Sequence, residues 1–287
     1  MGAQAAAVLA GGPVLGTLPP GAEAPRTAGV SLRPVPRGVG LDRVARSHGW
    51  CALAPYAYDR VTQTLHRVLL APGPVAVAIR RDFSVDWGGH ADAGLVREQL
   101  RWCLGLDDDL AGAPPAVARL RMLRAPSFFE DAVKTVLSTH TSFAALRRAV
   151  GHLTALGDGG AFPSATAVLR AGPAFLRDTV RAGYRAHSLL ALAELGDELE
   201  DLRGTSSRGD DELLLARLLR LPGVGPLSAR GLMALLGRPR PLEREGWALS
   251  MLDLTREECL SRYAAAGRWA GSAQWADIAA TWGAGGG

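Results

Sequence analysis

The sequence predicts an α+β fold in which a small antiparallel β-sheet precedes a larger, mostly α-helical core. Before about residue 88, short apolar runs alternate with small or polar residues and are separated by Pro and Gly, which is typical of strands. From about residue 93, apolar residues instead recur at helical spacing. A chain of 287 residues exceeds the usual size of one domain, so we expect two packed units.

The composition divides the chain into four segments. We expect a disordered leader at 1–39, a domain with the antiparallel sheet at 40–115, a helical domain at 116–282 and a flexible tail at 283–287. The leader has no basic residue before Arg26, so it lacks the charged start of a secretory signal. Its Gly and Pro residues also interrupt any membrane span. These features predict a cytoplasmic protein without a membrane partner.

Alternating apolar residues predict the strands of the first domain. The predicted strands are the alternating residues Trp50, Ala52 and Ala54 and the segments 64–72, 75–79 and 83–87. The turn sequence APGP joins two of these runs as in a hairpin. A helix is expected next, at 93–104, with Leu95, Val96, Leu100 and Trp102 facing the core.

Two sequences that favour helix N-termini occur later in the chain. Ser127 with Glu130, and Thr255 with Glu258, match the capping box, in which a Ser or Thr cap and a Glu three residues later bond each other's backbone N–H. The helix that starts at Ser127 is expected to end near Thr139 and His140. Other helices are predicted at 164–171, 174–182, 185–195 and 255–266.

A glycine-rich hairpin at 221–237, LPGVGPLSARGLMALLG, is the most informative stretch. A leucine-rich helix at 210–219 precedes it, Pro222, Gly223 and Gly225 interrupt the helical pattern, and a second helix continues to Gly237. Such a turn exposes backbone N–H groups beside a helix N-terminus, which can hold a phosphate without reading bases. The alternative is an ordinary helical hairpin with a Pro-Gly turn.

Together with three other ordered blocks, this hairpin resembles the helix-hairpin-helix (HhH-GPD) DNA glycosylases. The other blocks are SFFEDAVKTVLSTHTSF at 127–143, FPSATAVLRAGPAFLRDTVRAGYRAHSLLALA at 162–193 and SRYAAAGRWAGSAQWADIAATW at 261–282. A sheet before the helices is similar to the alkyladenine and 8-oxoguanine glycosylase branch. The resemblance implies double-stranded DNA as the partner of a nucleoid-associated monomer. It implies DNA contacts by Pro222, Gly223, Val224, Gly225, Pro226, Leu227, Ser228, Thr139 and His140.

The resemblance also implies a catalytic carboxylate just after the hairpin. In the family an Asp stabilises the oxocarbenium-like sugar formed when the base leaves. Counted without a gap, its D-x-W motif falls on 245–247, so Glu245 takes the place of the Asp and Trp247 matches. The longer Glu side chain moves the carboxylate by about 1.5 Å, which is enough to slow catalysis. Glu243 or Asp253 could serve instead only with a gap or a change of helix face.

The same comparison predicts the type of reaction. Members with lyase activity use a lysine in the second hairpin helix, and Leu227 occupies that position here, so hydrolysis without a lyase step is expected. Lys134, the single lysine of the chain, lies in another helix and is expected on the surface. Aromatic walls normally hold a flipped base. Phe128 and Trp247 are expected in the base pocket, whereas Phe129, Trp269 and Trp275 are weaker candidates because aromatic residues at helical spacing usually belong to cores.

Cysteines and charge limit the cofactors. Cys51, Cys103 and Cys259 are widely spaced, which predicts buried thiols in a reducing compartment and no zinc or iron–sulfur site. No cofactor is expected to be required, although hairpin carbonyls could hold a monovalent cation. The net charge of +4 and a pI near 9.3 mildly favour a polyanionic partner.

Two functions follow from these features. The first is a monofunctional DNA glycosylase that removes alkylated purines, whose positive charge weakens the glycosidic bond. The second is a catalytically impaired relative that binds DNA or recognises damage without turnover. The missing Asp and the apolar Ala248 and Leu249, at positions that are polar or basic in the family, favour the second.

Overall fold

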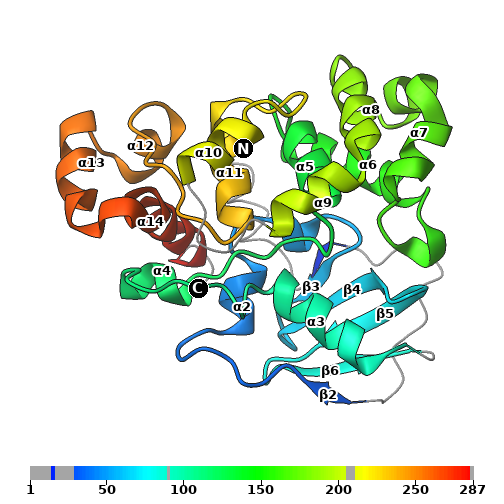
Figure 1. The fold of residues 1–287 in the computed structure, drawn as a ribbon. Coiled ribbons are helices and arrows are strands. Elements are labelled where there is room, and N and C mark those ends of the chain that lie inside the picture. The colour runs from blue at the N-terminus through cyan, green and yellow to red at the C-terminus, as the bar shows by residue number, and fades with distance from the viewer. Residues whose placement is uncertain (1–13, 17–28, 89–90, 205–210, 285–287) are drawn as a thin grey trace.

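The computed structural model describes residues 14–16, 29–88, 91–204 and 211–284 (Figure 1). The strands are β1 (Val14–Gly16), β2 (Val30–Ser31), β3 (Ala57–Asp59), β4 (Thr64–Leu70), β5 (Pro74–Ile79) and β6 (Ser84–Trp87). The helices are α2 (Leu41–Ala45), α3 (Ala93–Cys103), α4 (Pro115–Arg119), α5 (Phe128–Leu137), α6 (Phe143–Thr154), α7 (Ala165–Ala174), α8 (Arg185–Leu195), α9 (Asp197–Gly204), α10 (Asp211–Leu218), α11 (Pro226–Leu235), α12 (Trp247–Leu252), α13 (Arg256–Tyr263) and α14 (Ala270–Ala284). This arrangement confirms the expected α+β class.

The sheet is antiparallel, with the strand order β1-β3-β4-β5-β6-β2. The predicted hairpin is present, since Leu65 of β4 pairs with Ile79 of β5 and Leu70 pairs with Pro74. The strand expected around Trp50 is wrong. Residues 50–52 form a short 3₁₀ helix after Gly49, whose φ is +100°. All three side chains of that helix are buried, so the apparent alternation does not separate two faces.

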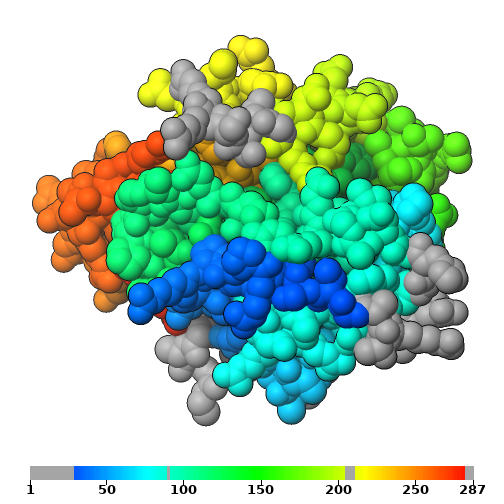
Figure 2. Space-filling view, turned by 60° about the horizontal axis from the view of Figure 1, so that its bottom comes forward, coloured from blue at the N-terminus to red at the C-terminus, as the bar shows by residue number. Residues whose placement is uncertain are grey.

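The segment after β2 is held against α3, where Figure 2 shows the N-terminal chain in blue along the teal helix. Arg101 donates to the carbonyls of Leu32 and Pro34, the latter at 2.9 Å. Part of the expected leader is therefore structured, because β1 and β2 belong to the sheet, whereas residues 1–13 and 17–28 lie outside the described residues. Leu95 is exposed rather than buried.

Helix α5 is the centre of the helical part, where it packs against α6, α8, α9 and α11 (Figure 1). Every side chain from Phe128 to Leu137 is buried, because neighbouring helices and the sheet domain surround it. The two helices predicted at 164–171 and 174–182 are confirmed, because Gly172, with a φ of +74°, breaks α7 between them and the second continues as a π turn at 175–179. The predicted tail needs correction. Residues 283–284 of the expected tail belong to α14, and 285–287 lie outside the described residues.

Glu130 links α5 to the sheet domain. Ser127 Oγ accepts a hydrogen bond from its N–H at 3.3 Å, as predicted, but the carboxylate does not complete the capping box. It pairs instead with Arg67 of β4 at 2.6 Å and with Lys134 at 2.5 Å. The expectation that Lys134 is a surface charge is wrong, because its side chain is fully buried. The second capping box, of Thr255 and Glu258, is confirmed.

The three cysteines are buried and unpaired with one another, as expected from their spacing. Among the described helices, none combines the length and the apolar character needed to cross a bilayer.

Candidate functional site

The turn between α10 and α11 adopts the predicted helix-hairpin-helix geometry. Gly223 has a φ of +76°, and a Cβ at this position would lie 2.9 Å from the Ser188 side chain of α8 and 3.1 Å from Val136 of α5. Val224 closes the turn, since its side chain is buried and its N–H donates to the Leu221 carbonyl at 3.1 Å. Gly223 is therefore required by close packing inside the protein as well as by its backbone angle.

Gly225 differs from Gly223, because neither its backbone angle nor the described residues around it exclude a side chain. Its φ is −96° and open space surrounds the position of a Cβ. It is the N-cap of α11, its carbonyl accepts from Ala229 N–H, and it offers no side-chain cap to the helix. Pro226 follows at the first turn, and Leu227 is 54% exposed. The first turn of α11 thus presents backbone N–H groups toward solvent, as a phosphate site needs.

The end of α5 lies beside this hairpin through the contact between Val136 and Gly223. Thr139 is partly buried, and both its carbonyl and its hydroxyl accept hydrogen bonds from Arg185 of α8. His140 is exposed and has a φ of +44°. The structure therefore brings two of the predicted DNA-facing segments, the 139–140 turn and the hairpin, next to each other.

An open hollow of about 610 Å³ lies beside the N-terminal half of α11. It is lined by Leu227, Arg230, Pro241, Leu242, Glu243, Arg244, Glu245, Gly246 and Trp247. It therefore contains the segment in which a catalytic carboxylate was expected.

Glu245, the predicted catalytic residue, is at the exposed edge of this hollow. Its side chain is 81% exposed and pairs with Arg256 at 3.3 Å, and the Arg256 side chain is itself 60% exposed. Water solvates a carboxylate in such a place, which weakens its electrostatic effect on a nearby reaction.

Glu243 is the buried carboxylate of the same hollow, with 5% of the residue exposed. Gln274 of α14 clamps its backbone, because Glu243 N–H donates to Gln274 Oε1 at 3.0 Å and Gln274 Nε2 donates to the Glu243 carbonyl at 2.8 Å. Its Oε1 accepts from the Ala248 N–H at the start of α12, at 3.2 Å. No described residue donates a hydrogen bond to Oε2, which lies 3.5 Å from Nη2 of Arg240.

The aromatic residues beside Glu243 only partly match the prediction. Trp247 lines the hollow, as expected, and its ring centroid is 6.1 Å from that of Trp275 of α14. Phe128 belongs to the buried core and is not among the residues that line the hollow. Trp275, ranked as a core residue from sequence, is the second aromatic ring near the carboxylate. Its Nε1 donates to the carbonyl of Ser47 in the sheet domain.

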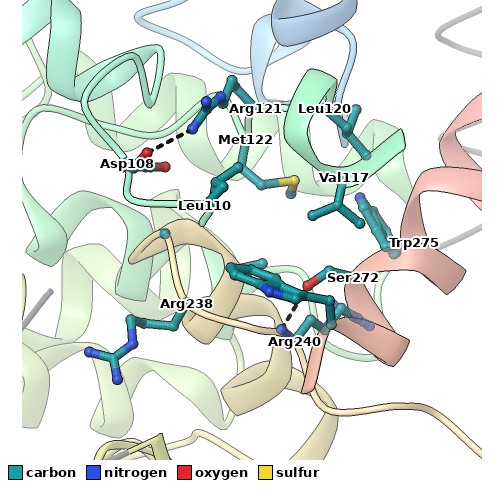
Figure 3. Close-up of a pocket in the computed structure, with 13 residues that line it drawn as sticks. Asp108, Leu110, Val117, Leu120, Arg121, Met122, Arg238, Arg240, Ser272 and Trp275 are labelled. Atoms are coloured by element: carbon teal, nitrogen blue, oxygen red, sulfur yellow. Dashed lines mark hydrogen bonds between the residues drawn. The ribbon is translucent and has the colours of Figure 1, made fainter. Parts of the chain in front are cut away.

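Arg240 was not found from the sequence. Its guanidinium carbon lies 4.7 Å from the centroid of the Trp275 ring, and its backbone N–H donates to Ser272 Oγ of α14 at 2.9 Å (Figure 3). Burial lowers the pKa of Arg240 to about 10, and Arg230 adds to this effect while Glu243 opposes it. A buried arginine leaves no hydrophobic periodicity in the sequence that would predict its burial. The burial of Glu243 could have been predicted only from the apolar residues Pro241 and Leu242 that precede it.

Comparison with known proteins supports the fold. No family model and no curated protein sequence matches the chain. Solved structures are similar over most of it. A 3-methyladenine DNA glycosylase from Archaeoglobus fulgidus superimposes with a TM-score of 0.66 at 17% identity, covering 88% of this chain and 97% of that one. The 8-oxoguanine glycosylase/lyase of Clostridium acetobutylicum, in complex with double-stranded DNA containing cytosine opposite 8-oxoG, gives 0.62 at 14% identity, covering 85% and 92%.

A third structure, MBOgg1 in complex with a low affinity DNA ligand, gives a TM-score of 0.61 at 15% identity and covers 85% of this chain and 94% of that one. These identities are too low to carry over a substrate or a catalytic residue. The chain has the helix-hairpin-helix fold of the 3-methyladenine and 8-oxoguanine DNA glycosylases, with their preceding antiparallel sheet.

Proposed function

We propose that this protein is a monofunctional DNA glycosylase that hydrolyses the N-glycosidic bond of a flipped, damaged base. The observation that carries this proposal is the buried Glu243 carboxylate, clamped on α14, in a hollow that adjoins the phosphate-binding end of a helix-hairpin-helix element. DNA held by the hairpin would thus place a flipped nucleotide close to a carboxylate.

Glu243 is the favoured catalytic residue of this proposal and Glu245 the alternative. As the bond between the base nitrogen and C1′ breaks, its electron pair leaves with the base and positive charge develops on the sugar. A carboxylate withdrawn from water stabilises that charge better than a solvated one. Water then forms the new C1′–O bond and releases a proton. Leu227 has no amine, so no Schiff base forms at that position, and no step depends on a monovalent cation.

DNA binding in this proposal is anchored by the hairpin and completed by the 139–140 turn. The first turn of α11 offers backbone donors and the positive end of the helix dipole, which hold a phosphate regardless of sequence. Thr139 and His140 lie next to it, where they can occupy the gap left by the flipped nucleotide. Alkylated purines are the proposed substrates because their positive charge already weakens the bond to be cleaved.

Release of 7-methylguanine or 3-methyladenine from an alkylated duplex tests this function. We expect wild type to leave intact abasic strands that break only on treatment with hot alkali. The single-turnover rate should be about a hundredfold lower with Glu243→Gln, as for other losses of preorganised electrostatic stabilisation. Glu245→Gln removes a carboxylate from the edge of the same hollow and is the matched control, expected within about twofold of wild type because water screens that charge. A larger loss in Glu245→Gln than in Glu243→Gln would assign catalysis to Glu245.

A second function, DNA binding without base release, is favoured by the position of Arg240. Its guanidinium covers Trp275 and pairs with the only carboxylate buried among the residues that line the hollow. If wild type binds duplex DNA in a salt-dependent manner but releases no base from a broad set of lesions, the second function is correct. Affinity that does not change with ionic strength would contradict both.

A further inference from the structure

The stacking face of Trp275 is occupied by a side chain of the protein itself. The planar guanidinium of Arg240 lies 4.7 Å from the Trp275 ring centroid and 3.5 Å from Glu243 Oε2. On its other side is α11, where Gly231 has no side chain, and a Cβ there would be 4.0 Å from Arg240 Nη1. A planar cation thus fills the space between an aromatic ring, a helix backbone and a carboxylate.

A flipped base would need the same space. Its sugar must approach Glu243 for the carboxylate to act on C1′, and the base must stack on an aromatic ring near that carboxylate. Trp275 provides this ring only if Arg240 moves away. The partly buried Trp247 lies 6.1 Å from Trp275 and borders the entrance to the site.

Only the side chain of Arg240 can move easily. Its backbone is fixed on α14 by Ser272, and a Cβ at Gly271 would be 2.3 Å from the Arg240 carbonyl oxygen. The pocket on the other side of the residue, between α4, α11 and α14, measures about 40 Å³ (Figure 3). That volume accommodates a few water molecules at most. Arg240 does not itself line the open hollow of about 610 Å³, but the adjacent residues 241–243 do, so this hollow is the open space next to the residue.

We propose that Arg240 holds the place of the flipped base, so that the site exchanges one planar cation for another and Glu243 favours a cationic base. This inference rests on the proposed function. Departure of the guanidinium leaves Glu243 without its positive partner, and leaving a buried carboxylate unpaired is unfavourable. A cationic alkylated purine restores both the positive charge and the stacking on Trp275. A neutral base restores only the stacking, so it is selected against.

Nucleoside binding tests this exchange without DNA and without turnover. Dissociation constants are measured by calorimetry for 7-methylguanosine, at a pH at which its base is cationic, and for guanosine. We expect Arg240→Ala to bind both nucleosides at least about tenfold more tightly than wild type, since no side chain has to be displaced. In both proteins 7-methylguanosine should bind more tightly than guanosine, because its positive charge pairs with Glu243. Arg148→Ala, which removes an exposed arginine of α6 outside the hollow, is the matched control and should behave as wild type.

A second variant keeps the test possible if Arg240→Ala does not fold. Arg240→Gln keeps most of the aliphatic packing but removes the charge, and it should show the same preference for the cationic nucleoside. Unchanged affinity for 7-methylguanosine in the folded Arg240 variants, or equal affinity of wild type for the two nucleosides, would overturn the inference. If wild type releases bases but either of these two results is obtained, the inference fails and the proposed function stands. If the nucleoside affinities are as expected but wild type releases no base, the proposed function fails and the nucleoside-binding site stands.

Discussion

His48 shows how a single buried side chain can make the stability of this protein depend on pH. Its Nδ1 is 2.9 Å from Ser47 Oγ, its ring centroid is 4.6 Å from that of Trp50, and its Nε2 has no partner among the described residues. Burial lowers the pKa of His48 to about 3, and the positive charges of Lys134 and Arg240 contribute. The folded protein therefore keeps the imidazole neutral at pH values at which the unfolded chain takes up a proton.

The residue-scale prediction concerns acid unfolding. A depressed pKa gives stability that is present above the unfolded-state value of about 6.5 and lost as the pH falls toward about 3. Below about pH 6.5, protonation of this histidine in the unfolded chain should lower the free energy of unfolding by up to about 1.4 kcal/mol per pH unit. We expect His48→Asn, which retains a polar group toward Ser47, to flatten that slope in urea unfolding between about pH 7 and 5. Equal slopes in both proteins would mean that His48 does not titrate on unfolding.

At the scale of one element, the two glycines of the hairpin differ: the fold requires Gly223, whereas we expect Gly225 to matter for binding. Gly223 is excluded from carrying a side chain by its positive φ and by Ser188 and Val136. Gly225 has an ordinary extended backbone and free space around it. Both glycines look equivalent in the motif PGVG. Because nothing in the protein requires Gly225, we expect its small size to matter to a molecule that approaches the first turn of α11.

The element-scale prediction compares the two positions. Gly225→Val should lower the free energy of unfolding by only about 1 kcal/mol, because valine is a poorer N-cap than glycine. It should weaken binding to damaged and undamaged duplexes by a similar factor, about tenfold, through loss of backbone contacts to phosphate. Gly223→Ala should instead destabilise the fold by about 2 kcal/mol, because of its positive φ and the close packing. Fluorescence anisotropy at matched salt measures binding, and circular dichroism checks folding. A folded Gly225→Val with wild-type affinity for undamaged duplex would show that the hairpin is not the DNA anchor.

At the scale of the whole molecule, the sheet and the helical core are joined by the buried Arg67, Glu130 and Lys134. Arg67 also stacks on Tyr56, with its guanidinium carbon 4.3 Å from the ring centroid. Burial tends to raise the pKa of Glu130, but Arg67 and Lys134 lower it overall. Burial also lowers the pKa of Lys134, an effect that Glu130 opposes. One carboxylate therefore compensates two cations withdrawn from water, which makes it the most sensitive member of the group.

The whole-molecule prediction is that Glu130→Gln destabilises the protein by about 3–5 kcal/mol, because two buried cations lose their counter-charge. Lys134→Met should destabilise the protein clearly less than Glu130→Gln, since it leaves the ion pair between Arg67 and Glu130, at 2.6 Å, intact. Urea unfolding followed by circular dichroism provides both values. If the two variants were equally stable, the charges of this cluster would not contribute to joining the sheet to α5.

The sequence by itself determined the helical periodicity of the core, the β4–β5 hairpin and the Pro-Gly turn of the helix-hairpin-helix element. These features depend on local propensity and on patterns within one element, which neighbouring residues in the chain are enough to specify. The tertiary structure alone decided that Glu245 is exposed and Glu243 is buried. The two residues are two positions apart, and Gln274, about thirty positions further along the chain, bonds only the backbone of Glu243.

The same holds for charges that the sequence would place in water. Lys134 and Arg240 have carboxylate partners close by in the chain, Glu130 and Glu243. Distant segments supply the aromatic faces of Tyr56 and Trp275 that help to bury them. Burying a charge is favourable only when a partner and an aromatic face are assembled around it, and that assembly exists only after the chain has folded. The hairpin motif thus predicted the proposed DNA anchor, whereas the packing of α14 decided which carboxylate and which aromatic ring are buried near it.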